Sequence, residues 1–187
     1  MELILASQSP RRRQLLEERG YEVKVCPADI DESMNADLSV DEALEQLAHR
    51  KACAVKDGHE DAVIVAADTI VVFQDEILGK PHDGREACDY LSRLSGETHE
   101  VKTGVCILCP EGEFTFTDTT RVHFADLSEQ DILDYVATGK PLDKAGAYGI
   151  QECGFADDID GSYTNVVGLP MEKLDNALQI LTKTIYK

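Results

Sequence analysis

Two long segments in the middle of the chain, residues 98–109 and 114–124, alternate between apolar and polar side chains. Such alternation is typical of β-strands that present different faces to the core and to solvent. The connecting residues 110–113 include a proline and a glycine. The two segments are therefore predicted to form a long antiparallel hairpin, which brings antiparallel strands into the sheet of this protein.

Further strands and helices are predicted on both sides of this hairpin. Apolar or alternating stretches at 3–6, 21–25, 62–67 and 70–73 predict strands. Helices are expected where a capping residue precedes an apolar stripe. They begin after Ser9, Ser39, Asp83 and Ser128, and a last helix covers about 171–184. This mixture indicates an α/β protein with a mixed sheet.

Three consecutive arginines occupy the predicted first turn of the first helix. Arg11, Arg12 and Arg13 follow Ser9-Pro10, the expected N-cap and first helical position. Cations are unfavourable at the positive end of a helix dipole, by roughly 0.3–1 kcal/mol each. An anion bound there would account for them. The alternative is solvation or pairing with carboxylates, which fits Arg13 because Glu17 lies four residues on.

Asp68 stands between two strongly apolar segments. A carboxylate in such surroundings is costly to bury unless a metal, a cation or a catalytic role accompanies it. Asp68 and Thr69 could instead form a tight turn between two strands. The functional interpretation is the stronger of the two, and it makes Asp68 a candidate catalytic residue.

Other candidates are individually weaker. Lys51 falls on a predicted helix and Lys80 lies in a Gly-Lys-Pro sequence, and both could simply be solvated. The segments 143–151 and 160–170 are predicted to be long polar loops. Loops of this length are often functional, but they could also be ordinary surface loops with turn glycines.

The charge balance excludes one class of partner. The chain has 36 acidic and 18 basic residues, giving a net charge of −18. This field repels nucleic-acid phosphates but can concentrate divalent cations. No apolar run is long enough to span a membrane and the N-terminal residues do not resemble a signal peptide, so a cytoplasmic location without membrane contact is expected.

Several common motifs do not match. Gly139-Lys140 lacks the spacing of a Walker A loop, and no GxSxG sequence of a serine hydrolase is present. Cys106 and Cys109 have CxxC spacing, but no second Cys or His pair accompanies them. The six cysteines are therefore expected to be reduced and structural.

Five short motifs together resemble those of the Maf family of nucleoside triphosphate pyrophosphatases. They are Ser7-Gln8-Ser9-Pro10-Arg11-Arg12, Ala67-Asp68-Thr69, Gly79-Lys80-Pro81, residues 143–151 and Gly168-Leu169-Pro170. The resemblance covers essentially the whole chain in the family's order and spacing. The departures, Gln8 where glycine is common and the third arginine Arg13, affect no residue assigned a role.

The resemblance implies hydrolysis of a nucleoside triphosphate between its α- and β-phosphates, with Mg²⁺ or Mn²⁺ as cofactor. It implies a single domain over residues 1–187 with a mixed, strongly twisted sheet flanked by helices. Two lobes would surround a deep cleft, as in proteins of the inosine triphosphatase type, and many members are homodimers.

The resemblance also assigns roles to individual residues. Asp68 matches the proton acceptor, and it is expected to hold the metal together with Glu32. Arg11, Thr69 and Gln151 match positions that influence base choice. The polar residues that match the lining of the phosphate and metal region are Ser9, Arg12, Glu32, Lys51 and Lys80. Lys51 and Lys80 are also expected to assist catalysis.

Gln151 and the run Asp160-Gly161-Ser162-Tyr163 resemble the branch that acts on dTTP and UTP. The branch acting on 7-methyl-GTP tends to have glutamate at the position of Gln151. An amide can donate to a pyrimidine O4 and accept from N3–H, whereas a carboxylate only accepts. The alternative function is a non-catalytic nucleotide-binding regulator of cell division, which would not need Asp68 as a base.

Overall fold

The computed structural model describes residues 2–185 as a mixed α/β structure. Its strands form a seven-stranded sheet in the order β2-β1-β3-β5-β6-β7, with β4 also paired to β3. The predicted fold class is confirmed. The chain forms two compact units. The first unit comprises Met1–Asp68, Thr103–Asp118 and Gly168–Lys187, and the second comprises Thr69–Lys102 and Thr119–Val167. The predicted deep cleft and single domain stay predictions.

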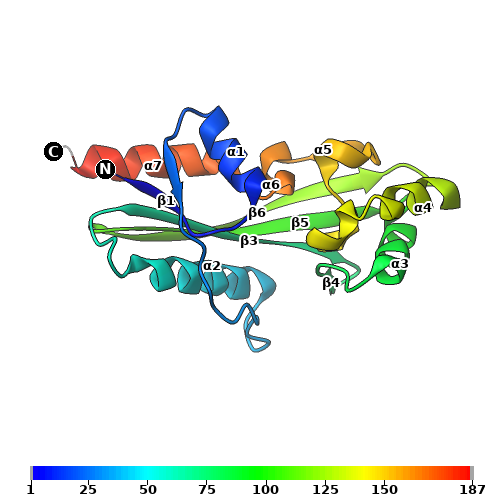
Figure 1. Cartoon of the computed structure of the whole chain (residues 1–187), viewed down its shortest axis with the longest axis horizontal. Coiled ribbons are helices and arrows are strands. Elements are labelled where there is room, and N and C mark those ends of the chain that lie inside the picture. The colour runs from blue at the N-terminus through cyan, green and yellow to red at the C-terminus, as the bar shows by residue number, and fades with distance from the viewer. Residues whose placement is uncertain (1, 186–187) are drawn as a thin grey trace. The chain divides into compact units, whose positions relative to one another are not determined.

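The first unit contains three parallel strands covered by helices. Its elements are β1 (Leu3–Leu5), α1 (Pro10–Glu18), β2 (Val23–Val25), α2 (Val40–Lys56), α7 (Met171–Ile185) and parts of β3 (Val63–Phe73), β5 (Thr98–Cys109) and β6 (Gly112–Phe124). Strand β1 pairs in parallel with both β2 and β3. Helices α1 and α7 cover one face of the sheet and α2 covers the other, as Figure 1 shows. Apolar strands buried on both faces are expected for this arrangement.

Helix α2 begins at the predicted cap, Ser39, which forms a capping box with Glu42: each side chain bonds the other residue's backbone N–H. Its buried stripe includes Leu44, Leu47 and Ala48 and continues to Lys51. The helix approaches β5 closely, because a Cβ added to Gly104 would lie 2.7 Å from the Leu44 carbonyl carbon. The glycine in β5 therefore permits the short distance between helix and sheet.

Strand β3 differs from the prediction. The residues expected to form two strands, separated at Asp68 and Thr69, form one continuous strand, Val63–Phe73. Both residues are half-buried within it. The turn interpretation of Asp68 is therefore wrong, and the carboxylate projects from a regular strand.

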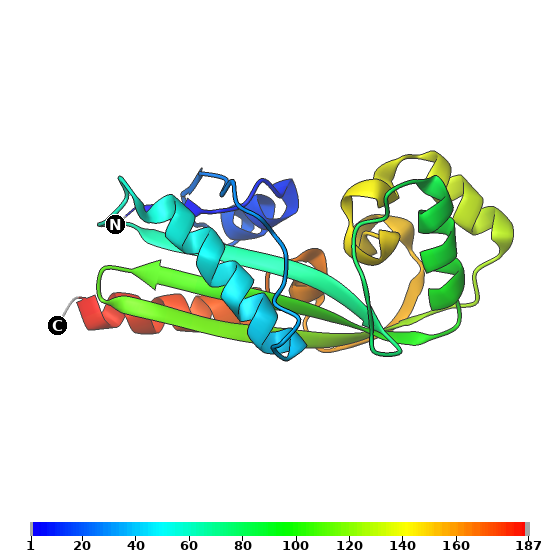
Figure 2. The same ribbon diagram turned by 90° about the horizontal axis from the view of Figure 1, so that it is seen from below.

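The second unit contains α3 (Gly84–Leu94), α4 (Glu129–Ala137), β4 (Glu76–Leu78) and the outer parts of the long strands (Figure 2). The two segments predicted as loops contain short elements instead. They include the 3₁₀ turns η1 (Lys140–Asp143) and η2 (Ala145–Ala147), the helices α5 (Ile150–Cys153) and α6 (Tyr163–Val167), and the end of β7 (Ala156–Asp160). Each is too short, or too acidic in the case of β7, to give a periodic apolar signal.

Aromatic side chains pack around a buried histidine in the second unit. His99 is 2% exposed, and its ring meets Phe124 and Tyr148 edge-on. Its Nε2 lies 2.8 Å from the Tyr148 hydroxyl. Burial lowers the pKa of His99 from 6.5 to about 4, with a smaller contribution from His123.

This burial predicts an acid-sensitive stability. Between pH 6.5 and about 4, the unfolded chain binds a proton at His99 that the folded chain does not bind. The free energy of unfolding should therefore fall by roughly 3 kcal/mol across this window and be insensitive to His99 above it. Urea denaturation at several pH values measures the effect. A His99→Gln variant that retains the same fall would contradict this assignment.

Candidate functional site

Helix α1 begins where β1 ends, and its first turn is fixed by serines. Ser9 is the N-cap and its Oγ accepts from the Arg12 backbone N–H at 3.4 Å. Ser7 Oγ accepts from the Ser9 N–H at 3.2 Å. These bonds confirm the expected cap and define the backbone that precedes the arginines.

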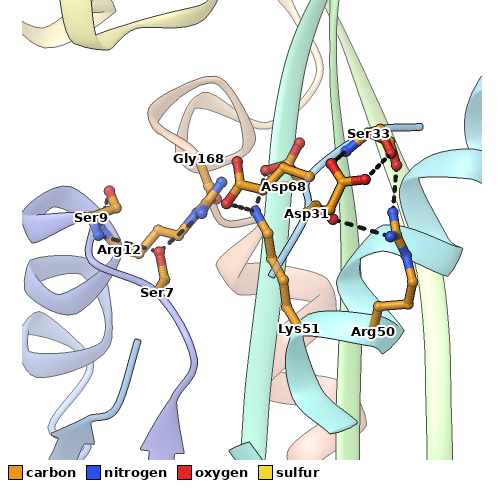
Figure 3. A network of polar contacts seen from close by, with 10 residues as sticks. Ser7, Ser9, Arg12, Asp31, Ser33, Arg50, Lys51, Asp68 and Gly168 are labelled. Atoms are coloured by element: carbon orange, nitrogen blue, oxygen red, sulfur yellow. Dashed lines mark hydrogen bonds and ion pairs between the residues drawn. The ribbon is translucent and has the colours of Figure 1, made fainter. Parts of the chain in front are cut away.

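The three arginines differ in their surroundings. Arg13 is exposed and pairs with Glu17 at 2.7 Å, as expected from their spacing. Arg12 is 9% exposed, and its Nε donates to the Gly168 carbonyl at 2.7 Å. Its NH1 donates to Ser7 Oγ at 3.1 Å, so the guanidinium is held between two distant parts of the chain (Figure 3).

The buried guanidinium of Arg12 experiences nearby charges of both signs. Burial lowers the pKa of Arg12, Asp68 raises it, Arg11 lowers it, and Glu32 raises it by a smaller amount. Arginine nevertheless stays protonated in proteins. Arg12 is therefore a permanent cation close enough to Asp68 and Glu32 to interact with both.

Lys51 joins the two candidate metal ligands. Its Nζ lies 2.7 Å from Asp68 Oδ1 and 2.9 Å from Glu32 Oε1. The Lys51 side chain is 7% exposed, compared with 20% for Asp68 and 55% for Glu32. Because Lys51 continues the buried stripe of α2, its alkyl chain is covered by the core while its ammonium reaches the carboxylates.

The topology explains why these groups meet. Strand β1 lies between β2 and β3, and the chain leaves it toward α1 on one face and later returns through α2 on the other. Ligands of α/β proteins bind outside the carboxyl ends of strands at such a switch point. The register pairs Leu5 with Val65, so Asp68 lies three residues beyond the last paired position of β1.

A second set of bonds shapes the segment that carries Glu32. Asp31 accepts from the Ser33 backbone N–H at 2.9 Å and from its hydroxyl at 2.7 Å. These bonds lower the pKa of Asp31. Arg50, next to Lys51 on α2, donates to the carbonyl oxygens of Asp31 and Ser33 (Figure 3). The two adjacent residues of α2 thus bind both the side chain of Glu32 and the backbone around it.

The carboxylates of Glu32 and Asp68 fit a divalent cation that receives its remaining ligands from a substrate. Both place an oxygen within 3 Å of the same Lys51 nitrogen. Within residues 2–185, however, no cluster of three or more His, Cys, Asp or Glu side chains is arranged to hold a metal alone. Mg²⁺ is commonly bound by one or two carboxylates together with phosphates and water.

Five of the candidate residues therefore form one cluster in the first unit: Ser9, Arg12, Glu32, Lys51 and Asp68. Arg11 is half-buried in the same turn of α1. Thr69 follows Asp68 on β3 and belongs to the second unit, as do Lys80 and Gln151, both exposed. The roles of these three residues stay predictions.

Sequence reasoning missed three contributors to the cluster. Ser7 and the Gly168 carbonyl anchor Arg12, and both lie in motifs noted above without a role for these residues. Arg50 supports the segment around Glu32, where Asp31 and Ser33 have the spacing of an Asx-turn. That spacing could have indicated an ordered segment, but nothing in it pointed to Arg50.

Comparison with known proteins gives one family over nearly the full length. Residues 2–181 match the family model described as Maf-like protein. A protein of Geobacillus sp. (strain WCH70) named dTTP/UTP pyrophosphatase is 49% identical over 174 residues, covering 92% of this chain and 94% of the relative. One of the same name from Halalkalibacterium halodurans is 49% identical over 180 residues, covering 95% of each.

Two solved structures share the fold at low sequence identity. The Ham1 protein of Staphylococcus aureus has a TM-score of 0.52 at 15% identity and covers 98% of this chain and 99% of its own. A HAM1 protein from Coxiella burnetii has a TM-score of 0.55 at 15% identity with the same coverage. At this identity the likeness concerns the fold alone.

The contrast between two neighbouring arginines predicts which of them attracts an anion. Arg12→Ala should weaken binding of inorganic triphosphate by about tenfold or more, because a charge-assisted hydrogen bond contributes roughly 1.5–3 kcal/mol. Arg13→Ala is the matched control and should change the affinity little, since exposed ion pairs contribute less than about 1 kcal/mol. Titration calorimetry measures both. A loss confined to the Arg13 variant would contradict this choice of arginine.

Proposed function

Because this chain belongs to the Maf-like family, we propose that it is a dTTP/UTP pyrophosphatase. It hydrolyses the bond between the α- and β-phosphates and releases the nucleoside monophosphate and pyrophosphate. Such an enzyme removes nucleotides, including modified pyrimidine nucleotides, from the cellular pool. The names of the relatives and the match to residues 2–181 support this assignment.

The observation that carries the proposal is the position of Asp68. It lies on β3 within 2.7 Å of the buried Lys51 ammonium and interacts electrostatically with Arg12. A polyphosphate needs cations to hold it, and its hydrolysis needs a base to activate water. The cluster provides both within one unit of the chain.

We assign the chemical steps to residues of this cluster, together with Arg11 and with Lys80 of the second unit. Arg11 and Arg12 bind the phosphates, with Lys51 and Lys80 as further cations. Asp68 orients a water molecule and takes its proton while the water oxygen bonds to the α-phosphorus. The bond from the α-phosphorus to the bridging oxygen breaks, and pyrophosphate leaves with that oxygen. Lys51 holds Asp68 Oδ1, and Oδ2 of the same carboxylate is the proposed proton acceptor.

A divalent cation is the proposed cofactor. Glu32 and Asp68 would hold Mg²⁺ or Mn²⁺ beside the phosphates. When bound, the metal supplies positive charge that stabilises the departing pyrophosphate.

Base selection is assigned to Arg11, Thr69 and Gln151. The Gln151 amide can donate to O4 and accept from N3–H of thymine or uracil. This pattern suits a pyrimidine edge better than a carboxylate, which can only accept hydrogen bonds.

The cellular setting follows from the reaction. No helix within residues 2–185 is long and apolar enough to cross a membrane. We place the enzyme in the cytoplasm, where nucleoside triphosphates are used. The homodimer expected from the family resemblance is part of the same proposal.

Product analysis tests the function directly. Incubation with dTTP and Mg²⁺ should yield equimolar thymidine monophosphate and pyrophosphate. A protein that only binds nucleotides as a regulator would release neither product, and a phosphatase would release orthophosphate. Either result would reject the proposal.

Asp68→Asn should leave the fold intact but slow dTTP hydrolysis at least a hundredfold, because a positioned base contributes about 10²–10⁴ to the rate. Asp118→Asn is the control, since it breaks another Asp–Lys pair, with Lys173, in the same unit. Steady-state release of pyrophosphate measures both rates. Near-normal turnover of the Asp68 variant would remove this residue from the mechanism.

Glu32→Gln should raise the Mg²⁺ concentration needed for half-maximal activity by about tenfold or more, because a neutral amide binds a hard cation more weakly than a carboxylate does. Glu22→Gln alters an exposed glutamate of the same unit and serves as control. Activity measured against Mg²⁺ concentration reports the change. An unaltered metal dependence in the Glu32 variant would show that this carboxylate does not hold the cation.

A further inference from the structure

A buried lysine lies beneath the segment that carries Gln151. Lys144 is 7% exposed. Its Nζ donates to the Lys140 carbonyl at 2.6 Å, to Asp143 Oδ1 at 2.6 Å and to Glu152 Oε1 at 3.0 Å. An ammonium has three donors, so this arrangement uses its full capacity. A buried cation satisfied in this way fixes its partners strongly, because breaking the set leaves an uncompensated charge.

The same Glu152 oxygen is part of a longer chain of hydrogen bonds. Tyr135 is buried on α4, and its hydroxyl donates to Glu152 Oε1 at 3.1 Å. That hydroxyl accepts from the Gly149 backbone N–H at 3.0 Å. Burial raises the pKa of Tyr135, so the hydroxyl keeps the proton that it donates. Lys144, Glu152 and Tyr135 are hereafter called the clamp.

Gly149 leaves room for the clamp. Its φ of −116° is open to any residue, so the backbone conformation does not require glycine. A Cβ at this position would instead lie 2.8 Å from Lys144 Cε and 2.9 Å from Glu152 Oε1. The absent side chain therefore allows the ion pair to pack directly against the backbone.

The clamp holds the residues on both sides of Gln151. Gln151 lies in α5, a helix of four residues whose N-cap has no side-chain hydrogen bond. Such a short helix is not stable by itself. The Gly149 N–H precedes Gln151 and the Glu152 carboxylate follows it, and both are bonded within the clamp. Ile150, between Gly149 and Gln151, is buried. Gln151 itself is exposed, so its placement depends on these neighbours.

We propose that Lys144, Glu152 and Tyr135 are positioning residues that set the nucleobase selectivity by fixing the backbone of Gln151. The inference rests on the proposed function, in which the Gln151 amide recognises a pyrimidine. Hydrogen-bond recognition depends on geometry, and a displacement of about 1 Å at a positioning group can change rates about 10²-fold. The clamp is all within the second unit, so its effect on α5 is local.

Hydrogen exchange tests the ordering role without any substrate. Tyr135→Phe retains the ring packed against Phe155 but removes the hydroxyl that links Gly149 to Glu152. Amide exchange of residues 149–153 should accelerate at least tenfold in this variant and in Glu152→Gln. Glu76→Gln is the matched control, because it breaks an exposed pair with Arg93 in the same unit. Unchanged exchange in both clamp variants would overturn the proposal.

Substrate selectivity tests the functional part. The ratio of kcat/KM for dTTP to that for dGTP should fall at least tenfold in Tyr135→Phe and in Glu152→Gln, and stay unchanged in Glu76→Gln. In a Gln151→Ala background, adding Tyr135→Phe should cause no further fall. The proposal would be overturned if the clamp variants exchanged faster but kept the native kcat/KM ratio. It would also be overturned if Tyr135→Phe lowered the ratio equally in the Gln151→Ala background. If the native protein releases no pyrophosphate, the proposed function fails, whereas the exchange measurement still decides whether the clamp orders the segment.

Discussion

The buried ammonium of Lys51 is the interaction on which the candidate site depends. Its Nζ lies 2.7 Å from Asp68 on β3 and 2.9 Å from Glu32, which lies in an exposed segment. Without this ammonium between them, the two negatively charged carboxylates would repel each other. Lys51 can occupy this position because α2 approaches β5 closely at Gly104 and directs its buried stripe at the sheet. The packing of one helix thus determines the electrostatics of the site.

Local signals predicted much of the fold. The helix caps at Ser9, Ser39 and Ser128 and the hairpin could be predicted, because each depends on residues close together in sequence. The prediction of two separate strands on either side of Asp68 was wrong, because pairing with neighbouring strands outweighs the low strand propensity of aspartate. The elements β4, β7 and α6 were missed because their sequences have no apolar period and they are stabilised by tertiary contacts.

The residues of the candidate site could be predicted, but the contacts between them could not. Arg12, Lys51 and Asp68 come from three separate elements, and their assignment to one site came from the family resemblance. The sequence alone gave no reason to separate Arg12 from Arg11, since neither has a carboxylate four residues on. The structure separates them through burial and through the Gly168 carbonyl, a partner 156 residues away. Contacts at this separation depend on the completed fold and cannot be derived from spacing.

Each unit contains a buried lysine that is paired with carboxylates, but the two lysines differ in their surroundings. Lys51 and Lys144 are both buried lysines paired with carboxylates, and each could be mistaken for part of a catalytic centre. Their partners distinguish them. Lys144 uses its donors on a backbone carbonyl and on two carboxylates of its own segment, which makes it a structural cation. Lys51 binds one carboxylate from strand β3 and one from the segment before α2, beyond the last residue of β1 that pairs with β3, and this location is the reason for proposing a functional role for it.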